Sequence, residues 1–418
     1  MVVKESVLVQ AIALVRNVSI AVSLLSASLS SLAQDKILKI YHDADRSVHT
    51  ESALSIERGI LTALAEVNYM AQGYALEFVK QNHRGNVIRS KRNYQAFIND
   101  PKALVMFSGI HSPPLIKNRK FINENKALTL VPWAAGGPIT RFPMAENWIF
   151  RLSIDDSQVG AVLADYALKN KQCKTPHLLL ENTPWGDSNL KTLTTAFSQA
   201  GIKTPEVSRF GFNLKKNGAD YLLRTIDQKG SDCIVLVANA VEGAHIANAM
   251  ENLPIDLRLP IISHWGITAG DFHEKVPQDT RVNIDLNFIQ SCFSFNSSKL
   301  TEFQQGVFDN ARKLFPDDIR VNSDVKSPVG FIHGYDLTRV MLAALENIEI
   351  VDDLNITRER LRRALENLTQ PIQGLVRRYE RPFTVFDPVD HPNAHEALNA
   401  QDYCMAYYGK SDEILLVE

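Results

Sequence analysis

The sequence predicts an α/β protein of two lobes, each built on a parallel β-sheet. At 418 residues the chain is too long for one hydrophobic core and fits two domains. Short apolar segments alternate with amphipathic segments of helical spacing, and two such series follow one another along the chain. Alternating units of this kind form parallel sheets covered by helices, so we expect two Rossmann-like lobes joined by a multi-strand hinge.

The first series begins at Lys36. Its expected strands are 37–41, 75–81, 103–108 and 128–132, and its expected helices are 52–68, 87–99 and 115–125. In the first of these helices Ile56, Ile60 and Leu64 recur at helical spacing. That helix is therefore expected to bury one face and to leave the other in water.

The second series begins after Leu152. Its expected helices are 157–169, 188–200, 219–228 and 243–252, and its expected strands are 177–181, 206–212, 233–238 and 261–264. The chain continues with an extended stretch at 287–295, helices at 298–315 and 330–348, and an α+β tail at 358–368 and 372–386.

The segments that follow the second series indicate that the chain crosses between the lobes more than once. We expect crossings near Ser153, Phe288 and Val351, which together make a hinge of several strands. With these boundaries the first lobe comprises 34–153 and 288–350, and the second lobe comprises 154–287 and 351–418.

Residues 1–33 have the composition of a secretory signal peptide. Lys4 and Arg16 lie among apolar residues, and Ser31 and Ala33 are small residues placed as a cleavage site requires. The alternative is an amphipathic helix or a retained anchor, but Arg16 interrupts the segment, which is short for a membrane span. No cysteine follows the cleavage site, so we expect a soluble periplasmic protein without a lipid anchor.

The charge and the cysteines restrict the partners. A net charge of −2 offers no basic field for nucleic acid, so no nucleic-acid partner is expected. Cys173, Cys233, Cys292 and Cys404 are too widely spaced for a zinc knuckle or a redox pair, and no metal or other cofactor is expected. Cys173 and Cys233 each precede an apolar strand, and both a disulfide between them and two buried free thiols are open.

Ligands of parallel α/β sheets bind beyond the carboxyl ends of the strands, where helices begin. Three of the four tryptophans, Trp133, Trp185 and Trp265, fall in such strand-to-helix loops. One tryptophan there could simply cap the core, but three predict rings that line a cleft and hold an apolar, planar or cationic ligand. Gly136, in the same loops, would let backbone amides approach the ligand.

Four stretches carry a resemblance to a known family. They are 131–135 (VPWAA), 150–158 (FRLSIDDSQ), 185–187 (WGD) and 334–336 (GYD). In their order and spacing the chain resembles the type I periplasmic solute-binding proteins of the branched-chain amino-acid and amide class, which are receptors of ABC importers. The resemblance runs from about residue 36 to the C-terminus. It implies a monomeric clamp that closes on one small solute by a hinge motion and delivers it to a membrane permease.

The family's binding residues can be carried over by position. In relatives that bind amino acids, a serine loop and a later Thr or Ser hold the carboxylate, an Asp holds the ammonium group, and an aromatic side chain packs on the ligand. The resemblance places Ser112 in the serine loop, Ala135 at the hydroxyl position, Asp156 at the ammonium position and Trp185 at the aromatic position.

The departures from this pattern argue against a simple aliphatic amino acid. Two further positions that often carry Tyr and Glu fall on Ala240 and Trp265, and Ala135 lacks a hydroxyl, so partners for a zwitterion are missing. Asp156 keeps one anionic contact, with a helix N-cap as its alternative role. We therefore expect an amino-acid-like, amide or cationic solute with apolar or aromatic surface. The expected ligand-binding residues are Ser112, Trp133, Ala135, Gly136, Asp156, Trp185, Glu242 and Trp265.

Two other classes of function are alternatives. A sensory receptor acting with a membrane kinase or chemoreceptor would use the same clamp, and the sequence does not separate it from a transport protein. An enzyme is not expected, because GxSxG, GxxxxGK, HExxH and a GxGxxG after a strand are absent. Four histidines invite a metal or general-base interpretation, but pocket or surface polarity also accounts for them: His111, His177, His245 and His264.

Overall fold

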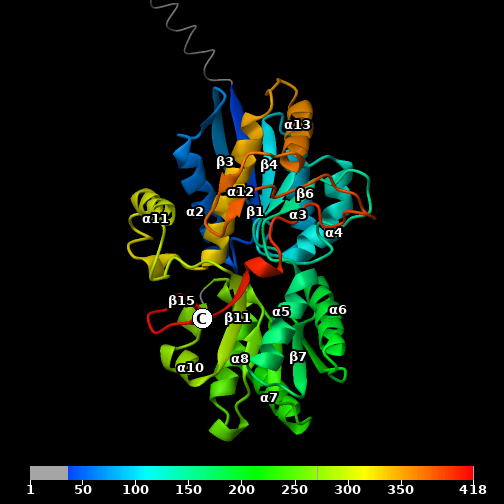
Figure 1. Ribbon diagram of the computed structural model, residues 1–418, viewed down its shortest axis with the longest axis vertical. Coiled ribbons are helices and arrows are strands. Elements are labelled where there is room, and N and C mark those ends of the chain that lie inside the picture. The colour runs from blue at the N-terminus through cyan, green and yellow to red at the C-terminus, as the bar shows by residue number, and fades with distance from the viewer. Residues whose placement is uncertain (1–35, 271, 418) are drawn as a thin grey trace, which may run out of the picture.

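The computed structural model describes residues 36–270 and 272–417 and shows two lobes stacked along the long axis of the molecule (Figure 1). The expected signal peptide, 1–33, lies outside the described residues. Each lobe is a mostly parallel sheet covered by helices, which confirms the predicted fold class. None of the helices in the described ranges combines the length and the apolarity of a membrane span.

The sheet of the first lobe has the strand order β2-β3-β1-β4-β5-β6. Its strands are β1 (Ile37–Ala44), β2 (Met70–Ala71), β3 (Tyr74–Asn82), β4 (Ala103–Ser108), β5 (Thr129–Val131) and β6 (Ile149–Arg151). Neighbouring strands are parallel except in the short β2–β3 hairpin. The inner strands β4 and β5 and the edge strand β6 are buried along their whole length, as expected of parallel strands covered by helices on both faces.

Helices α2 (Thr50–Glu66), α3 (Val87–Asn99) and α4 (Ser112–Glu124) connect these strands, and α12 (Pro328–Glu346) packs along α2. Glycines permit this close packing. A Cβ on Gly59 would lie 2.1 Å from the carbonyl oxygen of Phe331, and a Cβ on Gly334 would lie 2.7 Å from that of Ile56. The glycine of the 334–336 stretch therefore serves helix packing.

The sheet of the second lobe has the strand order β15-β14-β11-β10-β9-β7-β8. Its parallel strands are β7 (Pro176–Glu181), β8 (Glu206–Phe210), β9 (Cys233–Val237), β10 (Ile261–Ser263) and β11 (Leu286–Ser291), and β14 (Tyr403–Tyr408) and β15 (Ile414–Leu416) form an antiparallel edge. Its helices are α5 (Asp156–Lys169), α6 (Pro184–Gln199), α7 (Lys216–Gln228), α8 (Ala240–Glu251), α9 (Phe272–Lys275) and α10 (Gln278–Asn283), with 3-10 turns η1 (Ile255–Leu257) and η2 (Trp265–Thr268).

The crossings between the lobes agree with the sequence expectation at one point and differ at two. The first crossing lies between β6 and α5, at the expected Ser153. Phe288 is not at a crossing, because it pairs with Ala406 inside the second sheet, and the chain leaves this lobe only after β11. The chain returns at η4 (Ala400–Asp402), just before β14, and not near Val351.

The segment that follows Val351 lies with the first lobe, together with α11 (Glu302–Leu314) and η3 (Asn322–Asp324). Helix α13 (Leu354–Glu366) packs beside β4, where Arg358 donates to the carbonyl oxygen of Ala103 at 2.6 Å. The strands β12 (Ile372–Gln373) and β13 (Arg378–Tyr379) are held there because Asp336 of α12 accepts a hydrogen bond from Tyr379. We expected 351–418 in the second lobe; an amphipathic helix such as α13 can cover either sheet, and its spacing does not specify which.

Two disulfides fasten the second lobe and the hinge. Cys173 and Cys233 are bonded, which settles the alternative left open by the sequence; Cys173 precedes β7, and Cys233 begins its parallel neighbour β9. Cys292 and Cys404 are also bonded, with Cα atoms 4.9 Å apart and a sequence separation of 112. This second bond joins the end of β11 to β14, so it links the chain segments of two crossings.

A buried ion-pair network holds the first crossing to the C-terminal segment. Arg151, at the end of β6, is fully buried and donates from Nε and Nη2 to the two carboxylate oxygens of Glu396, both at 2.7 Å. It also pairs with Asp155 at 2.9 Å and donates to the Gly136 carbonyl oxygen at 2.9 Å. These partners compensate the large cost of removing a guanidinium from water.

We expect Glu396→Gln to lower the free energy of unfolding by about 3 kcal/mol, because it removes one carboxylate from a buried guanidinium. Urea denaturation followed by circular dichroism measures this change. Glu380→Gln is the matched control, since Glu380 pairs with Arg378 on the exposed surface and should contribute less than about 1 kcal/mol. Equal losses in the two variants would contradict the structural role of the network.

Candidate functional site

The carboxyl ends of the two sheets face each other, and the loops that follow the strands enclose a cavity between the lobes. The first lobe contributes the loops after β4 and β5, and the second lobe contributes the loops after β7, β9 and β10. The cavity is lined by Ile110, His111, Ser112, Pro113, Trp133, Ala135, Glu181, Trp185, Asn239, Trp265 and Gly266. The volume open to the centre of a water molecule is about 10 Å³, so the side chains nearly fill the space.

Three indole rings dominate this cavity. Trp133 of the first lobe meets Trp265 of the second lobe edge to face, with ring centroids 6.2 Å apart. Trp185 meets the His264 ring in the same geometry at 4.9 Å. The indole N–H groups of Trp133 and Trp185 are buried and have no hydrogen-bond partner among the described residues. The cavity thus presents flat apolar surfaces together with two hydrogen-bond donors that lack acceptors.

A glycine sets the position of Trp185. A Cβ on Gly266 would lie 2.3 Å from the carbonyl oxygen of Ala238 and 2.8 Å from the Trp185 ring. Gly266 follows Trp265 directly, so the turn after β10 can carry one indole into the cavity only because its next residue has no side chain to displace the other.

The serine loop has fewer backbone donors than a helix start usually offers. Ser112 begins α4, and its Oγ accepts a hydrogen bond from the Gly136 N–H at 3.0 Å. The next two residues, Pro113 and Pro114, have no N–H group. A carboxylate at this helix start would therefore find few free amides. Ala135 lines the cavity, whereas Gly136 lies behind it and holds Ser112 and Arg151.

The two neighbouring aspartates at the start of α5 have separate roles. Asp155 is the N-cap of α5, accepting from the Ser157 N–H, and it pairs with Arg141 and Arg151. Asp156 points elsewhere and contacts His264 Nε2 through its Oδ1 at 2.9 Å, both side chains being fully buried. The N-cap role that the sequence left open for Asp156 therefore belongs to Asp155. Asp156 supports the cavity through His264 and does not line it.

The acidic group that lines the cavity is Glu181, at the end of β7, which the sequence did not identify. It accepts a hydrogen bond from Asn239 at 3.0 Å. Burial, and next to it the charge of Glu242, raise the pKa of Glu181 from 4.5 to about 7. Glu242 itself lies outside the cavity and accepts from the Asn213 N–H. A carboxyl at the end of a buried apolar strand in a ligand-facing loop was the signal that could have found Glu181.

The structure thus brings together five of the eight residues expected to bind ligand, and places the others behind them. The five that line the cavity are Ser112, Trp133, Ala135, Trp185 and Trp265. Of the other three, Gly136 donates to Ser112, Asp156 contacts His264, whose ring packs on Trp185, and the charge of Glu242 acts on Glu181.

Known proteins share this architecture. The sequence profile of the periplasmic binding protein family matches residues 45–280, more than half of the chain. No curated protein matches the chain by sequence. The leucine-binding protein LivK of Thermotoga maritima is similar in structure, with a TM-score of 0.73, 15% identity, and 91% of this chain and 98% of that chain covered.

Two further solved structures were determined with ligands. The branched-chain amino-acid substrate-binding protein LivJ of Streptococcus pneumoniae, in complex with isoleucine, has a TM-score of 0.72 and 14% identity, covering 91% of this chain and 99% of that one. An ABC transporter solute-binding protein of R. palustris, in complex with benzoate, has a TM-score of 0.71 and 15% identity, covering 91% and 95%. At these identities the likeness establishes the fold.

The raised pKa of Glu181 predicts a pH-dependent stability. Between about pH 4.5 and 7 the folded chain holds a proton that the unfolded chain releases, so this group makes the free energy of unfolding fall as the pH rises. Glu181→Gln removes that effect, and its stability relative to the wild type should rise by up to about 3 kcal/mol across this window.

Urea denaturation at a series of pH values measures the difference. Glu206→Gln is the control, because Glu206 is exposed and its pKa is lowered by the hydrogen bond from Lys229. Its substitution should show no such rise. A Glu181→Gln curve parallel to that of the wild type would show that Glu181 titrates normally.

Proposed function

The chain belongs to the periplasmic binding protein family, in the type I class of the Leu/Ile/Val-binding proteins, and on that premise we propose that it is the substrate-binding component of an ABC importer. The family is periplasmic and consists of solute-binding proteins that are not enzymes. Export would use the leader at 1–33, and the partner would be a membrane permease that recognises the closed form of a monomeric clamp. The two disulfides suit an oxidising compartment.

The solute we propose is small and flat, with aromatic or amide character and at least one hydrogen-bond acceptor. The observation that carries this proposal is a pair of buried indole N–H groups without an acceptor among the described residues, one on Trp133 and one on Trp185, which line the cavity from opposite lobes. A carbonyl or carboxylate oxygen on a planar solute would satisfy them while its ring packs on the indoles. The R. palustris protein, solved with benzoate, supports an aromatic acid as one such solute.

A free ammonium group fits this site less well than in amino-acid-binding proteins. Asp156, at the position that the resemblance assigns to the ammonium, is already in contact with His264. Glu181 lines the cavity, but with a pKa of about 7 it is protonated in about half of the molecules at neutral pH, and in that form it can donate a hydrogen bond as well as accept one. We therefore expect the protein to bind an aromatic acid or amide more tightly than a zwitterionic aliphatic amino acid.

Binding would proceed by hinge closure. The solute first contacts one lobe, the second lobe adds its tryptophans, and the closed form becomes the populated state. The proposed ligand-contacting residues are Ser112, Trp133, Ala135, Glu181, Trp185, Asn239 and Trp265.

A thermal-shift screen of the purified protein tests the solute class. Aromatic carboxylates and amides should raise the melting temperature in proportion to occupancy, while leucine and isoleucine at equal concentration should not. We expect Trp185→Ala to weaken binding of the best ligand at least tenfold, because it removes both a ring contact and an N–H donor.

Trp148→Phe is the matched control. Trp148 is the one tryptophan outside the cavity lining; it is buried in the first lobe, with Lys126 and Arg362 over its ring. This substitution should lower stability without changing ligand affinity. Equal affinity losses in the two variants, or stabilisation by aliphatic amino acids alone, would contradict the proposed site and solute.

A further inference from the structure

A second group of chemically active side chains lies at the edge of the solute cavity. Asp45 follows β1 directly, His49 is the N-cap residue of α2, and His111 is the N-cap residue of α4, just after β4. Strands β1 and β4 are parallel neighbours, so their carboxyl ends and the loops that follow them lie side by side. The fold therefore brings two imidazoles and a carboxylate together from positions up to 66 residues apart.

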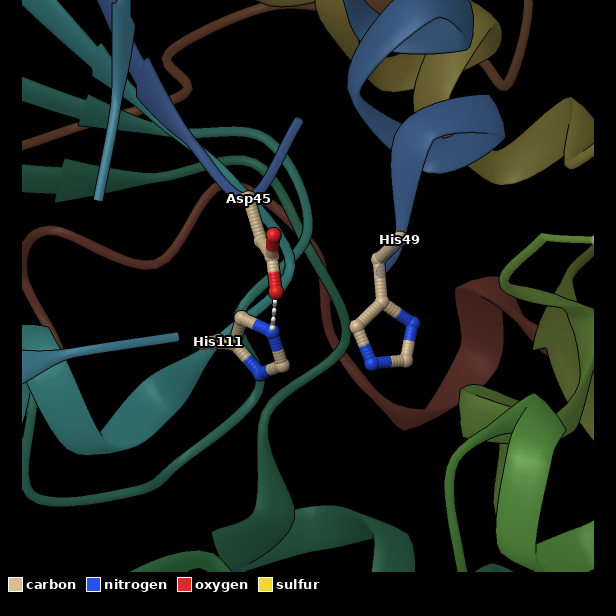
Figure 2. Close-up of side chains that lie close together, drawn as sticks. All are labelled: Asp45, His49 and His111. Atoms are coloured by element: carbon tan, nitrogen blue, oxygen red, sulfur yellow. Dashed lines mark ion pairs between the residues drawn. The ribbon is translucent and has the colours of Figure 1, made fainter. Parts of the chain in front are cut away.

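The three side chains converge (Figure 2). Asp45 points at the His111 ring, and the His49 ring faces the same space from the start of α2. One ligand-capable atom from each residue lies within 4.8 Å of the other two, and all three residues are buried. The rings of His49 and His111 meet edge to face, with centroids 4.8 Å apart.

The contact between Asp45 and His111 is not a well-formed hydrogen bond. Asp45 Oδ2 lies 3.4 Å from His111 Nε2, and that nitrogen is buried without a hydrogen-bond partner among the described residues. A separation of about 3.3–3.4 Å is what two ligand atoms have when each lies 2.0–2.1 Å from a tetrahedral zinc ion. The distance therefore suits two atoms that share a metal ion better than a donor and its acceptor.

The hydrogen bonds of Asp45 leave one of its carboxylate oxygens available to a metal ion. Asp45 Oδ1 accepts from the N–H groups of Ser47 and Val48, which leaves Oδ2 to face His111.

We propose that Asp45, His49 and His111 form a binding site for a divalent transition-metal ion of the zinc class. Two imidazole nitrogens and one carboxylate oxygen are a donor set that such ions prefer, and that Mg²⁺ and Ca²⁺, which favour oxygen ligands, do not. Three protein ligands leave a fourth position for water or another donor. Because His111 also lines the solute cavity, the ion would place a positive charge at its edge.

Zinc titration of the purified protein tests the proposal without any solute, so its outcome is independent of the proposed transport function. After treatment with a chelator and dialysis, isothermal titration should show one zinc ion bound per chain, with no binding of Mg²⁺ at the same concentration. His49→Ala, His111→Ala and Asp45→Asn should each weaken zinc binding by more than the about 10–100-fold that loss of an outer partner costs.

His391→Ala is the matched control, because His391 is exposed and belongs to the first lobe's C-terminal segment. It should keep the wild-type zinc affinity. Circular dichroism and melting temperature of the metal-free variants show that they are folded, and His49→Gln serves if an alanine variant is not. Absence of zinc binding to the wild type, an unchanged affinity in the His49 and His111 variants, or an equal loss in the control would overturn the proposal.

Discussion

The buried guanidinium of Arg151 is the constraint on which the hinge and the site both depend. A charge removed from water must be surrounded by partners, and those of Arg151 come from three separate parts of the chain: Asp155 from the first crossing, Glu396 from the C-terminal segment and the Gly136 carbonyl from the loop after β5. The backbone of Arg151 is bonded to the same C-terminal segment as its side chain. Its N–H donates to the His395 carbonyl oxygen, and its carbonyl oxygen accepts from the Ala397 N–H. The segment before the third crossing is thereby held like an added strand beside β6.

A series of contacts connects the Arg151 guanidinium to the cavity. Asp155, held by Arg151, caps α5 and so sets where the helix begins. The next residue, Asp156, turns away from its neighbour and meets His264 of the second lobe, whose ring packs edge-on against Trp185. Adjacent residues at a helix start point in different directions, and here one carboxylate serves the hinge while the other supports the cavity loop after β10. The position of the ligand-facing indole is thus coupled to the hinge.

What the sequence could predict follows from which interactions are local. Strands, helices and strand-to-helix loops depend on periodicity, so the two sheets and the loops with Trp133, Trp185 and Trp265 were predicted. The lobe assignment of α13 was not, because its apolar stripe specifies that a face is buried and not which sheet buries it. The grouping of Asp45, His49 and His111 depends on the order of strands in the sheet. Strand order is set by long-range pairing, which the local periodicity of the sequence does not predict.

The indole rings that line the cavity come from both lobes. In the structure Trp133 and Trp265 contact each other across the lobes, and both rings are almost completely buried. Opening of the proposed clamp would expose them, and an aromatic pair is worth about 0.5–1.5 kcal/mol beyond its buried area. A solute that enters between the lobes must replace the contacts it displaces and also supply acceptors to the buried N–H groups. A planar ring with an oxygen at its edge does both, whereas a compact aliphatic zwitterion would leave the indole faces without contacts and bring an ammonium group to an aspartate that His264 already occupies.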